Sequence, residues 1–292
     1  MNRLPARHGR LFIPLIAMDW TEEHDMRVLS FSFIWGRRAI PFWWHARPKG
    51  TLSRSRNSLE SNAGRLLKSW MGGRGFILPA DRGFHRTAFI RALSNKHGID
   101  FVIRVMKSTH VSVKGHRGAL GQLRLQVNKV RDFRLALYGS SARVPVRLVV
   151  KKVKVKRQQK NKRKSGYSTW YLVTSIKEES KQRMVGYYER RYGIEASYRD
   201  RKTAPGWKRQ RYIRDGERLI RRLPILTMVM IRAPVAAERK KVRKKKYIVM
   251  PQRSLGSNES ASIAQLGIRL IHWLSDRETS LRHEILFRVR GL

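Results

Sequence analysis

The fold is decided early in the chain, where residues 11–44 read LFIPLIAMDWTEEHDMRVLSFSFIWGRRAIPFWW. Short apolar runs at residues 11–18, 27–35 and 39–44 are bounded by charged or glycine residues, a pattern typical of buried β-strands. Because the connections between these runs are short, we expect three consecutive strands to form an antiparallel meander. Pro14 removes one backbone donor from the first strand without excluding it.

Helices and strands alternate over the next sixty residues. Apolar residues at helical spacing predict helices over residues 55–70 and 86–97, the second of them ending at Gly98. Residues 76–80 and 100–105 are short apolar runs typical of buried strands. This order of elements predicts an α/β fold.

The pattern changes between residues 106 and 170, where apolar and charged residues alternate. Such alternation is typical of half-buried strands, so we expect a separate, solvated sheet here. Within it, residues 157–164 (RQQKNKRK) predict a cationic turn or loop. Residues 171–176 (YLVTSI) then predict a buried strand, and residues 178–202 a long helix.

The C-terminal part of the chain is basic and predicted to be largely helical. We expect helices over residues 216–231 and 260–274, and a charge run, ERKKVRKKK, over residues 238–246. The amphipathic helix at 260–274 is a candidate dimer interface. Packing against its own domain is the alternative explanation of its apolar face.

The composition restricts the class of partner. The 292 residues include 65 Lys and Arg against 20 Asp and Glu, a formal charge of +45. A polyanion relieves such self-repulsion, so nucleic acid is the leading candidate and an anionic membrane surface the weaker one. The absence of cysteine excludes disulfides, Cys-ligated zinc and thiol catalysis, and fits a reducing cytoplasm. Apolar runs fall short of the ~20 residues of a spanning helix, so we expect no membrane partner.

Carboxylates are scarce in this chain, and two of them follow apolar runs directly. Asp19 ends the run at residues 11–18, and Asp81 ends the run at residues 76–80. If these strands are neighbours, both carboxylates reach one edge of the sheet, where two like charges need a cation. Oxygen-only ligands favour magnesium or manganese. Alternatively, each Asp simply caps the segment that follows it.

The long helix predicted over residues 178–202 adds a third acid. One of its faces would carry a phenol, two cations and an acid: Tyr188, Arg191, Glu195 and Lys202. At roughly 100° per residue, these positions fall within about 60° of one another. A surface ladder of ion pairs would show the same pattern, so the spacing alone leaves the role of this face open.

Four motifs, taken in order, resemble those of the insertion sequence 4 family of DDE transposases. The spacing Y-x2-R-x3-E-x6-K on that helix matches the family signature. Residues 80–84 (ADRGF), followed by a basic residue and Thr87, look like the second-aspartate motif, and residues 16–21 (IAMDWT) look like the first-aspartate strand. Residues 170–174 (WYLVT) resemble the W-x-L-x-T segment before the glutamate helix. The resemblance covers roughly residues 11–233.

The resemblance implies an α/β fold of the ribonuclease H-like kind, a mixed sheet flanked by helices with a β-rich insertion between the second Asp and the Glu. Four parts of the chain would follow. Residues 1–105 would form the first part of the catalytic core, and residues 106–170 the β-rich insertion. Residues 171–235 would form the second part of the core with the Glu helix, and residues 236–292 a basic run and helical tail.

The resemblance also implies cut-and-paste DNA transposition by phosphoryl transfer. Asp19, Asp81 and Glu195 would be the catalytic residues and would hold two Mg²⁺ or Mn²⁺ ions. Water would nick a transposon end, and the freed 3′-OH would then attack in hairpin formation or strand transfer. No covalent bond between protein and DNA is needed, so the lack of a nucleophile motif is no objection.

DNA contacts are implied for five residues. Tyr188, Arg191 and Lys202 would contact phosphates near the cleaved end, a task that suits cations. Trp170 would stack on a flipped base, with core packing as an equal alternative. Arg82 would touch phosphate or only a neighbouring carboxylate.

The implied partners are double-stranded DNA, as transposon ends and target, and a second copy of the chain in a synaptic homodimer. The basic runs at residues 151–164 and 239–246 would bind DNA backbone without reading sequence, or be solvated. We expect a bacterial, cytoplasmic, nucleoid-associated protein. Only 18 residues precede Asp19, where the family usually carries a DNA-end-binding segment, so we expect a truncated or start-shifted copy. The alternatives are a highly basic, non-catalytic nucleic-acid-binding protein and a nuclease without transposition.

Overall fold

The computed structural model describes residues 4–5, 11–23, 25–35, 38–123, 126, 129–141, 143–159, 162–203 and 216. The chain divides into two compact units, Met1–Ile194 and Glu195–Leu292. Apart from Gly216, the elements predicted at residues 216–231, 238–246 and 260–274 lie outside the described residues.

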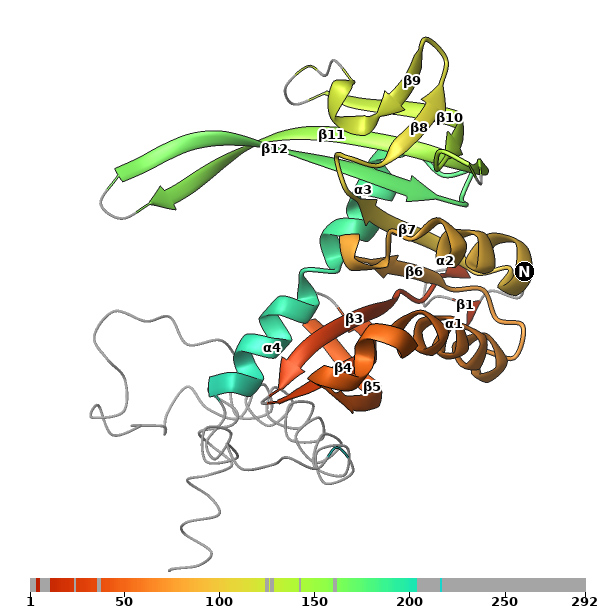
Figure 1. The fold of residues 1–292 in the computed structure, drawn as a ribbon, viewed down its shortest axis with the longest axis vertical. Coiled ribbons are helices and arrows are strands. Elements are labelled where there is room, and N and C mark those ends of the chain that lie inside the picture. The colour runs from red at the N-terminus through yellow and green to blue at the C-terminus, as the bar shows by residue number, and fades with distance from the viewer. Residues whose placement is uncertain are drawn as a thin grey trace, which may run out of the picture. The chain divides into compact units, whose positions relative to one another are not determined.

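One mixed sheet of ten strands dominates the first unit, in the order β5-β4-β3-β6-β7-β12-β11-β10-β8-β9 (Figure 1). Its strands are β3 Ile16–Glu23, β4 Met26–Trp35, β5 Arg38–Pro48, β6 Ile77–Ala80, β7 Asp100–Val105, β8 His110–Val113, β9 His116–Ala119, β10 Val130–Tyr138, β11 Val144–Gln159 and β12 Lys162–Thr174. Two short strands, β1 Leu4–Pro5 and β2 Leu11–Phe12, pair with each other. The prediction of a mixed α/β fold is confirmed.

The predicted meander is confirmed, because β3, β4 and β5 pair antiparallel in chain order. The first strand differs from its prediction at both ends. It begins at Ile16, after Pro14, which cannot donate a ladder hydrogen bond. It also runs on to Glu23, because β4 pairs with it as far as Met26. Asp19 therefore lies inside the strand and does not end it.

The centre of the sheet is parallel. β6 pairs in parallel with β3 on one side and β7 on the other. Parallel strands need crossover connections, which are supplied by α1 (Leu52–Trp70) and by α2 (Thr87–Arg91) with the π-helical turn η3 (Ala92–His97). The predicted helices are confirmed, including Gly98, whose φ of 56° makes it a left-handed C-cap.

The separate sheet predicted for residues 106–170 is wrong. β12 pairs antiparallel with β7 from Tyr171 to Thr174, so β8 to β12 continue the central sheet. The cationic loop predicted at residues 157–164 is also largely wrong, because β11 runs to Gln159 and β12 starts at Lys162. Beyond the main sheet these two strands pair only with each other, as a projecting ribbon (Figure 1). Alternation of apolar and charged residues identifies strands, but it does not reveal which sheet they join.

The long helix predicted over residues 178–202 is two helices, α3 Lys181–Arg190 and α4 Gly193–Thr203. The backbone turns at Arg191 and Tyr192, where each N–H donates to the carbonyl three residues before it. A Cβ on Gly193 would lie 2.9 Å from the backbone carbon of Arg38 in β5, so glycine permits this close approach. Tyr188 and Glu195 therefore do not share one uninterrupted helix.

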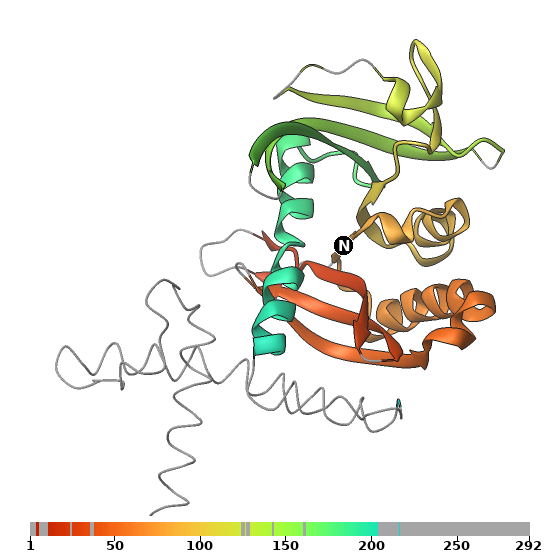
Figure 2. The same cartoon turned by 60° about the vertical axis from the view of Figure 1, so that its left-hand side comes forward.

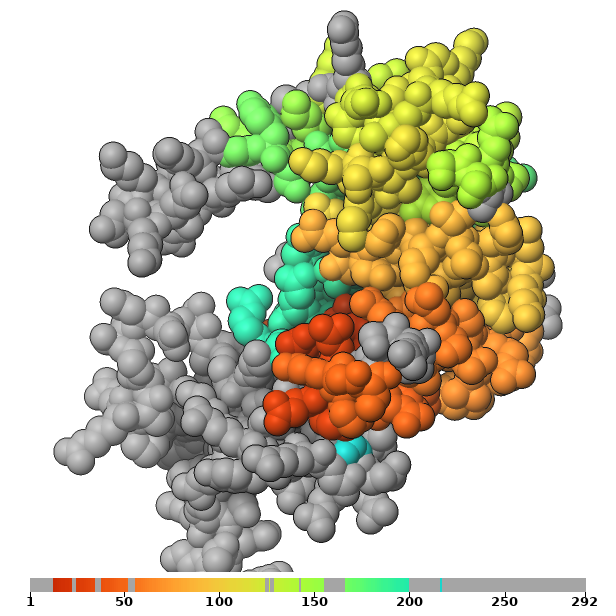
Figure 3. All heavy atoms as spheres, in the orientation of Figure 1, coloured from red at the N-terminus to blue at the C-terminus, as the bar shows by residue number. Residues whose placement is uncertain are grey.

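Helices cover both faces of the sheet, with α1 and α2 on one side and α3 on the other (Figure 2). Successive residues of β3 point to opposite faces of the sheet: Met18 packs in the cluster under α1, and Ala17 packs in the cluster under α3. The space-filling view shows one face of the first unit, on which the described segments between residues 11 and 123 lie against one another (Figure 3). No helix among the described residues is long and apolar enough to cross a membrane. The predicted division of the chain at residues 105, 170 and 235 stays a prediction.

Candidate active site

Asp19 and Asp81 are neighbours at one edge of the parallel centre. Met18 of β3 is paired with Ala80 of β6, so the residues that follow them, Asp19 and Asp81, lie side by side. The condition set in the sequence analysis, that the two strands be neighbours, is therefore met. Asp81 also caps the next segment, because its Oδ1 accepts a hydrogen bond of 2.7 Å from the N–H of Arg82, the first residue of the 3-10 turn η2 (Arg82–Phe84).

The guanidinium of Arg191 lies between the two carboxylates. Its Nη1 is 3.9 Å from Asp19 Oδ1, and its Nη2 is 3.9 Å from Asp81 Oδ2. Arg191 is 5% exposed, so this charge is held inside the protein. At these distances the contacts are ion pairs longer than hydrogen bonds. The positive charge of Arg191 offsets the repulsion between the two carboxylates. Two like charges this close need such a counter-charge.

Tyr188 of α3 completes the contacts. Its hydroxyl donates to Asp81 Oδ1 at 3.3 Å, and the Arg191 guanidinium carbon lies 5.6 Å from the centre of its ring. Tyr188 is fully buried. Burial raises the pKa of the Tyr188 phenol, and the nearby Arg191 opposes that rise. The phenol therefore keeps its proton at neutral pH and remains a donor to the carboxylate.

Trp170 of β12 packs against this group. Its ring lies 5.3 Å from the Tyr188 ring in an edge-to-face arrangement, and Lys151 Nζ sits 5.7 Å from the Trp170 ring centre. Lys151 also pairs with Glu189 at 2.9 Å. Trp170 is 9% exposed, so the core-packing alternative describes it in this structure. Stacking on a flipped base would require the ring to become uncovered, and that role stays a prediction.

Three candidates from the sequence analysis remain: Arg82, Glu195 and Lys202. Arg82 is exposed beside Asp81, and only its backbone N–H contacts the carboxylate. Glu195 lies in the first turn of α4, at the start of the second unit. Lys202 lies near the end of α4, and its side chain is outside the described residues. The structure therefore brings together four of the predicted residues: Asp19, Asp81, Tyr188 and Arg191.

A preformed metal centre is not part of the described region. No three His, Asp or Glu side chains within it lie close enough to hold a metal ion. Asp19 and Asp81 supply two carboxylates, and the predicted third ligand, Glu195, belongs to the other compact unit. The assignment of metal ligands stays a prediction.

Sequence reasoning missed Glu60, an acid on α1 with a fully buried side chain. Its carboxylate accepts from Trp20, Arg56 and Arg86, which come from three segments of the chain. A signal was present in the sequence. Glu60 lies three residues before Ala63 and seven before Leu67, so it falls on the apolar face of the helix.

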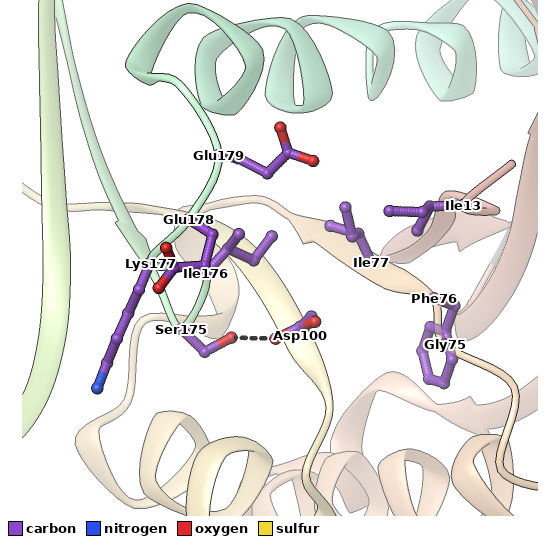
Figure 4. Close-up of a pocket in the computed structure, with 10 residues that line it drawn as sticks. All are labelled: Ile13, Gly75, Phe76, Ile77, Asp100, Ser175, Ile176, Lys177, Glu178 and Glu179. Atoms are coloured by element: carbon purple, nitrogen blue, oxygen red, sulfur yellow. Dashed lines mark hydrogen bonds between the residues drawn. The ribbon is translucent and has the colours of Figure 1, made fainter. Parts of the chain in front are cut away.

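A separate cavity of about 490 Å³ opens near the starts of β6 and β7, lined in part by Ile77 and Asp100 (Figure 4). Within it, the Ser175 hydroxyl donates to Asp100 Oδ1 at 3.1 Å. Asp81 follows the last residue of β6, whereas Ile77 is the first. The cavity and the paired aspartates are therefore at opposite ends of this strand.

Comparisons with known proteins give one family. A model of the transposase DDE domain matches residues 54–229. No curated protein sequence matches the chain. A cryo-EM structure of the piggyBac transposase synaptic complex with hairpin DNA is similar at 12% identity with a TM-score of 0.40, covering 85% of this chain and 60% of that one. The chain thus spans three fifths of the length of that protein. Because the family model matches more than half of its residues, the chain belongs to the transposase DDE domain family.

Proposed function

We propose that this protein is a DNA transposase of the insertion sequence 4 type, which cuts and joins DNA by metal-dependent phosphoryl transfer. The observation that carries the proposal is the pairing of Asp19 with Asp81 on adjacent parallel strands, with Arg191 at 3.9 Å from each. A transposase DDE domain requires acids at one place, and these two come from motifs more than sixty residues apart. Membership of the family supports the same conclusion.

The signature supports the finer assignment to the insertion sequence 4 type. Its first two residues, Tyr188 and Arg191, both touch the carboxylate of Asp81. A surface ladder of ion pairs would place such residues in solvent, whereas both side chains are buried here. The third and fourth residues, Glu195 and Lys202, are proposed to act at the same site.

The strand order supports a ribonuclease H-like core. Three antiparallel strands come first, and two parallel strands joined by helices follow, giving β5-β4-β3-β6-β7. The resemblance implies a mixed sheet flanked by helices, and this half of the sheet has that form. In open sheets with parallel strands, functional side chains gather where strands end, and Asp81 lies at such an end.

The residues present fit a divalent cation. Asp19 and Asp81 offer only carboxylate oxygens, which are the ligands of Mg²⁺ and Mn²⁺. The Arg191 guanidinium nitrogens lie 3.9 Å from these oxygens, so Arg191 does not form close hydrogen bonds with them. We propose that Asp19, Asp81 and Glu195 hold two such ions. When bound, the ions would activate the attacking oxygen and stabilise the leaving 3′ oxygen.

The protein's own residues supply the remaining parts of the mechanism. Arg191 can exchange the carboxylates for a DNA phosphate, because a guanidinium binds both kinds of anion. Tyr188 holds Asp81 in place through its hydroxyl. The formal charge of +45 favours the DNA backbone, here transposon ends and target bound by a homodimer. The basic residues 151–164 would contribute to that binding.

The test is nicking of supercoiled plasmid with MgCl₂ or MnCl₂. We expect the parent protein to nick and Asp81→Asn to lose the activity while still binding DNA, because asparagine keeps the shape but not the charge. Glu22→Gln is the matched control: it lies on the same strand as Asp19, and its side chain is 58% exposed. An Asp81→Asn protein that nicks as fast as the parent would refute the proposal.

The excess of cations favours a second candidate, a highly basic protein that binds nucleic acid without cutting it. The same assay separates the two candidates. A pure binder would show strong, salt-dependent binding and no cleavage with either metal. Nicking without joining of a 3′-OH end would indicate a nuclease that does not transpose.

A further inference from the structure

Glu60 on α1 is a buried acid that accepts hydrogen bonds from three side chains. Its side chain has no solvent exposure, and its two oxygens accept from three donors. Oε1 accepts from Trp20 Nε1 at 2.9 Å and from Arg56 Nε at 2.9 Å, and Oε2 accepts from Arg86 Nη2. A buried carboxylate is costly unless it is paired and hydrogen-bonded, so all of these contacts act together to keep it inside.

The donors lie next to the two aspartates in the sequence. Trp20 directly follows Asp19 on β3, so the two side chains point to opposite faces of the sheet. Glu60 therefore holds this strand from the face opposite to the carboxylate. The Arg56 guanidinium also lies 5.6 Å from the centre of the Trp20 ring, which strengthens the same attachment.

The other two contacts hold the turn that follows Asp81. Arg56 Nη2 donates to the carbonyl of Gly83 at 3.3 Å, and Arg86 comes two residues after the end of that turn. Arg86 binds the second oxygen of Glu60. One buried carboxylate on α1 thus connects the backbone beside Asp19 to the backbone after Asp81.

We propose that Glu60 is a positioning residue that sets the separation of the Asp19 and Asp81 carboxylates, and through it their affinity for a divalent cation. The inference rests on the proposed function, because it takes the two aspartates as cation ligands. Glu60 touches neither aspartate; it acts through Trp20 on one side and through Arg56 and Arg86 on the other. Residues that orient metal ligands typically change metal affinity by about 10–100-fold when they are replaced.

The test measures Mn²⁺ binding to the full-length protein, without DNA, from the electron paramagnetic resonance signal of free Mn²⁺. We expect Glu60→Gln to weaken Mn²⁺ binding by about tenfold, because glutamine cannot bind both arginines as a carboxylate does. The melting temperature, followed by circular dichroism, gives the loss of stability separately. This readout does not depend on whether the protein cuts DNA.

The matched control is Asp132→Asn. Asp132 pairs with Arg147, whose side chain is 1% exposed, at 2.7 Å, so this change also removes the acid of a buried ion pair. A merely structural role for Glu60 predicts that both variants lose stability and keep the Mn²⁺ affinity of the parent. The proposal predicts that only Glu60→Gln loses affinity. A joint loss of affinity in both variants would show general loosening and would overturn it.

A second variant keeps the test decisive if Glu60→Gln does not fold. Trp20→Phe removes only the Nε1 donor and keeps an aromatic ring beneath Arg56. We expect it to weaken Mn²⁺ binding by about two- to threefold, a partial loss of the support that Glu60 gives. Unchanged affinity in Trp20→Phe, or in a folded Glu60→Gln, overturns the proposal. A parent protein that binds no Mn²⁺ would instead refute the metal site of the proposed function.

Discussion

The two halves of the sheet are built on different plans. The half that carries the aspartates, β5-β4-β3-β6-β7, has a parallel centre, and helices lead into β6 and β7. The other half, β12-β11-β10-β8-β9, is antiparallel throughout. Parallel neighbours bring successive strand ends to one edge, whereas the ends of hairpin strands alternate between edges. Acids from distant motifs therefore meet in the first half, and the second half contributes supports such as Trp170.

Besides the pairing of Arg191 with Asp19 and Asp81, the described residues of each half include a buried ion-pair centre. In the first half Glu60 gathers Arg56 and Arg86. In the second half Arg147 gathers Asp132 and the carbonyls of the loop that leads into α3, at Ile176, Lys177 and Glu179. The first centre is an acid among cations and the second a cation among acceptors. In both cases one charge ties several segments together, so the loss of that charge should affect more than one contact.

Arg147→Ala is expected to have the largest effect, which is a loss of stability. The change leaves the Asp132 carboxylate without its Arg147 partner and removes the Nη1 group that three backbone carbonyls share as a donor. We expect the free energy of unfolding, measured with urea, to fall by about 3 kcal/mol. Arg183→Ala is the control, because its ion pair with Glu179 is on the surface and Arg183 is 64% exposed. Equal effects of the two changes would mean that the buried centre does not hold this half together.

The next effect concerns the turn between α3 and α4. A Cβ at Gly193 would meet the backbone of Arg38 at 2.9 Å, and backbone cannot move aside as a flexible side chain can. We expect Gly193→Ala to lower the free energy of unfolding by about 2 kcal/mol. Gly186 within α3 has open space at its Cβ position, so Gly186→Ala should raise stability by about 0.5–1 kcal/mol. Opposite signs in urea denaturation would confirm that β5 imposes the turn, and matching signs would contradict it.

The same residues show what could be predicted from the sequence. The strands of the first half follow from their apolar runs, whereas the neighbouring positions of Asp19 and Asp81 depend on the pairing of β3 with β6, which the runs do not reveal. The break at Gly193 could not be predicted, because a single glycine is tolerated in a helix, and the reason for this one lies in distant β5. The pairing of β12 with β7 could not be predicted for a similar reason, since periodicity identifies a strand but not its partner. Glu60 was missed because its partners are far apart in sequence.

Besides the pairing of β7 with β12, the two halves are connected through Tyr138, the last residue of β10. The smallest predicted effect tests that connection. Its hydroxyl donates to the carbonyl of His85, which follows the turn after Asp81, so the antiparallel half holds a segment of the half that carries the aspartates. We expect Tyr138→Phe to cost about 1 kcal/mol at neutral pH, the value of one hydrogen bond. Tyr167→Phe on the ribbon, where the ring is 52% exposed, should leave stability at neutral pH unchanged.

The difference in stability between Tyr138→Phe and the parent should change with pH. Burial raises the pKa of Tyr138 far above its usual value near 10, so above that pH the unfolded chain loses a proton that the folded protein keeps. Stability from this group is fully present below pH 10 and declines as the pH rises further, by about 1.4 kcal/mol per pH unit. Tyr138→Phe should flatten the decline in part, because Tyr171 and Tyr188 also have raised pKa values. The stability curves of variant and parent should therefore converge between pH 10 and 11, and parallel curves would show that the Tyr138 hydroxyl is not buried against His85.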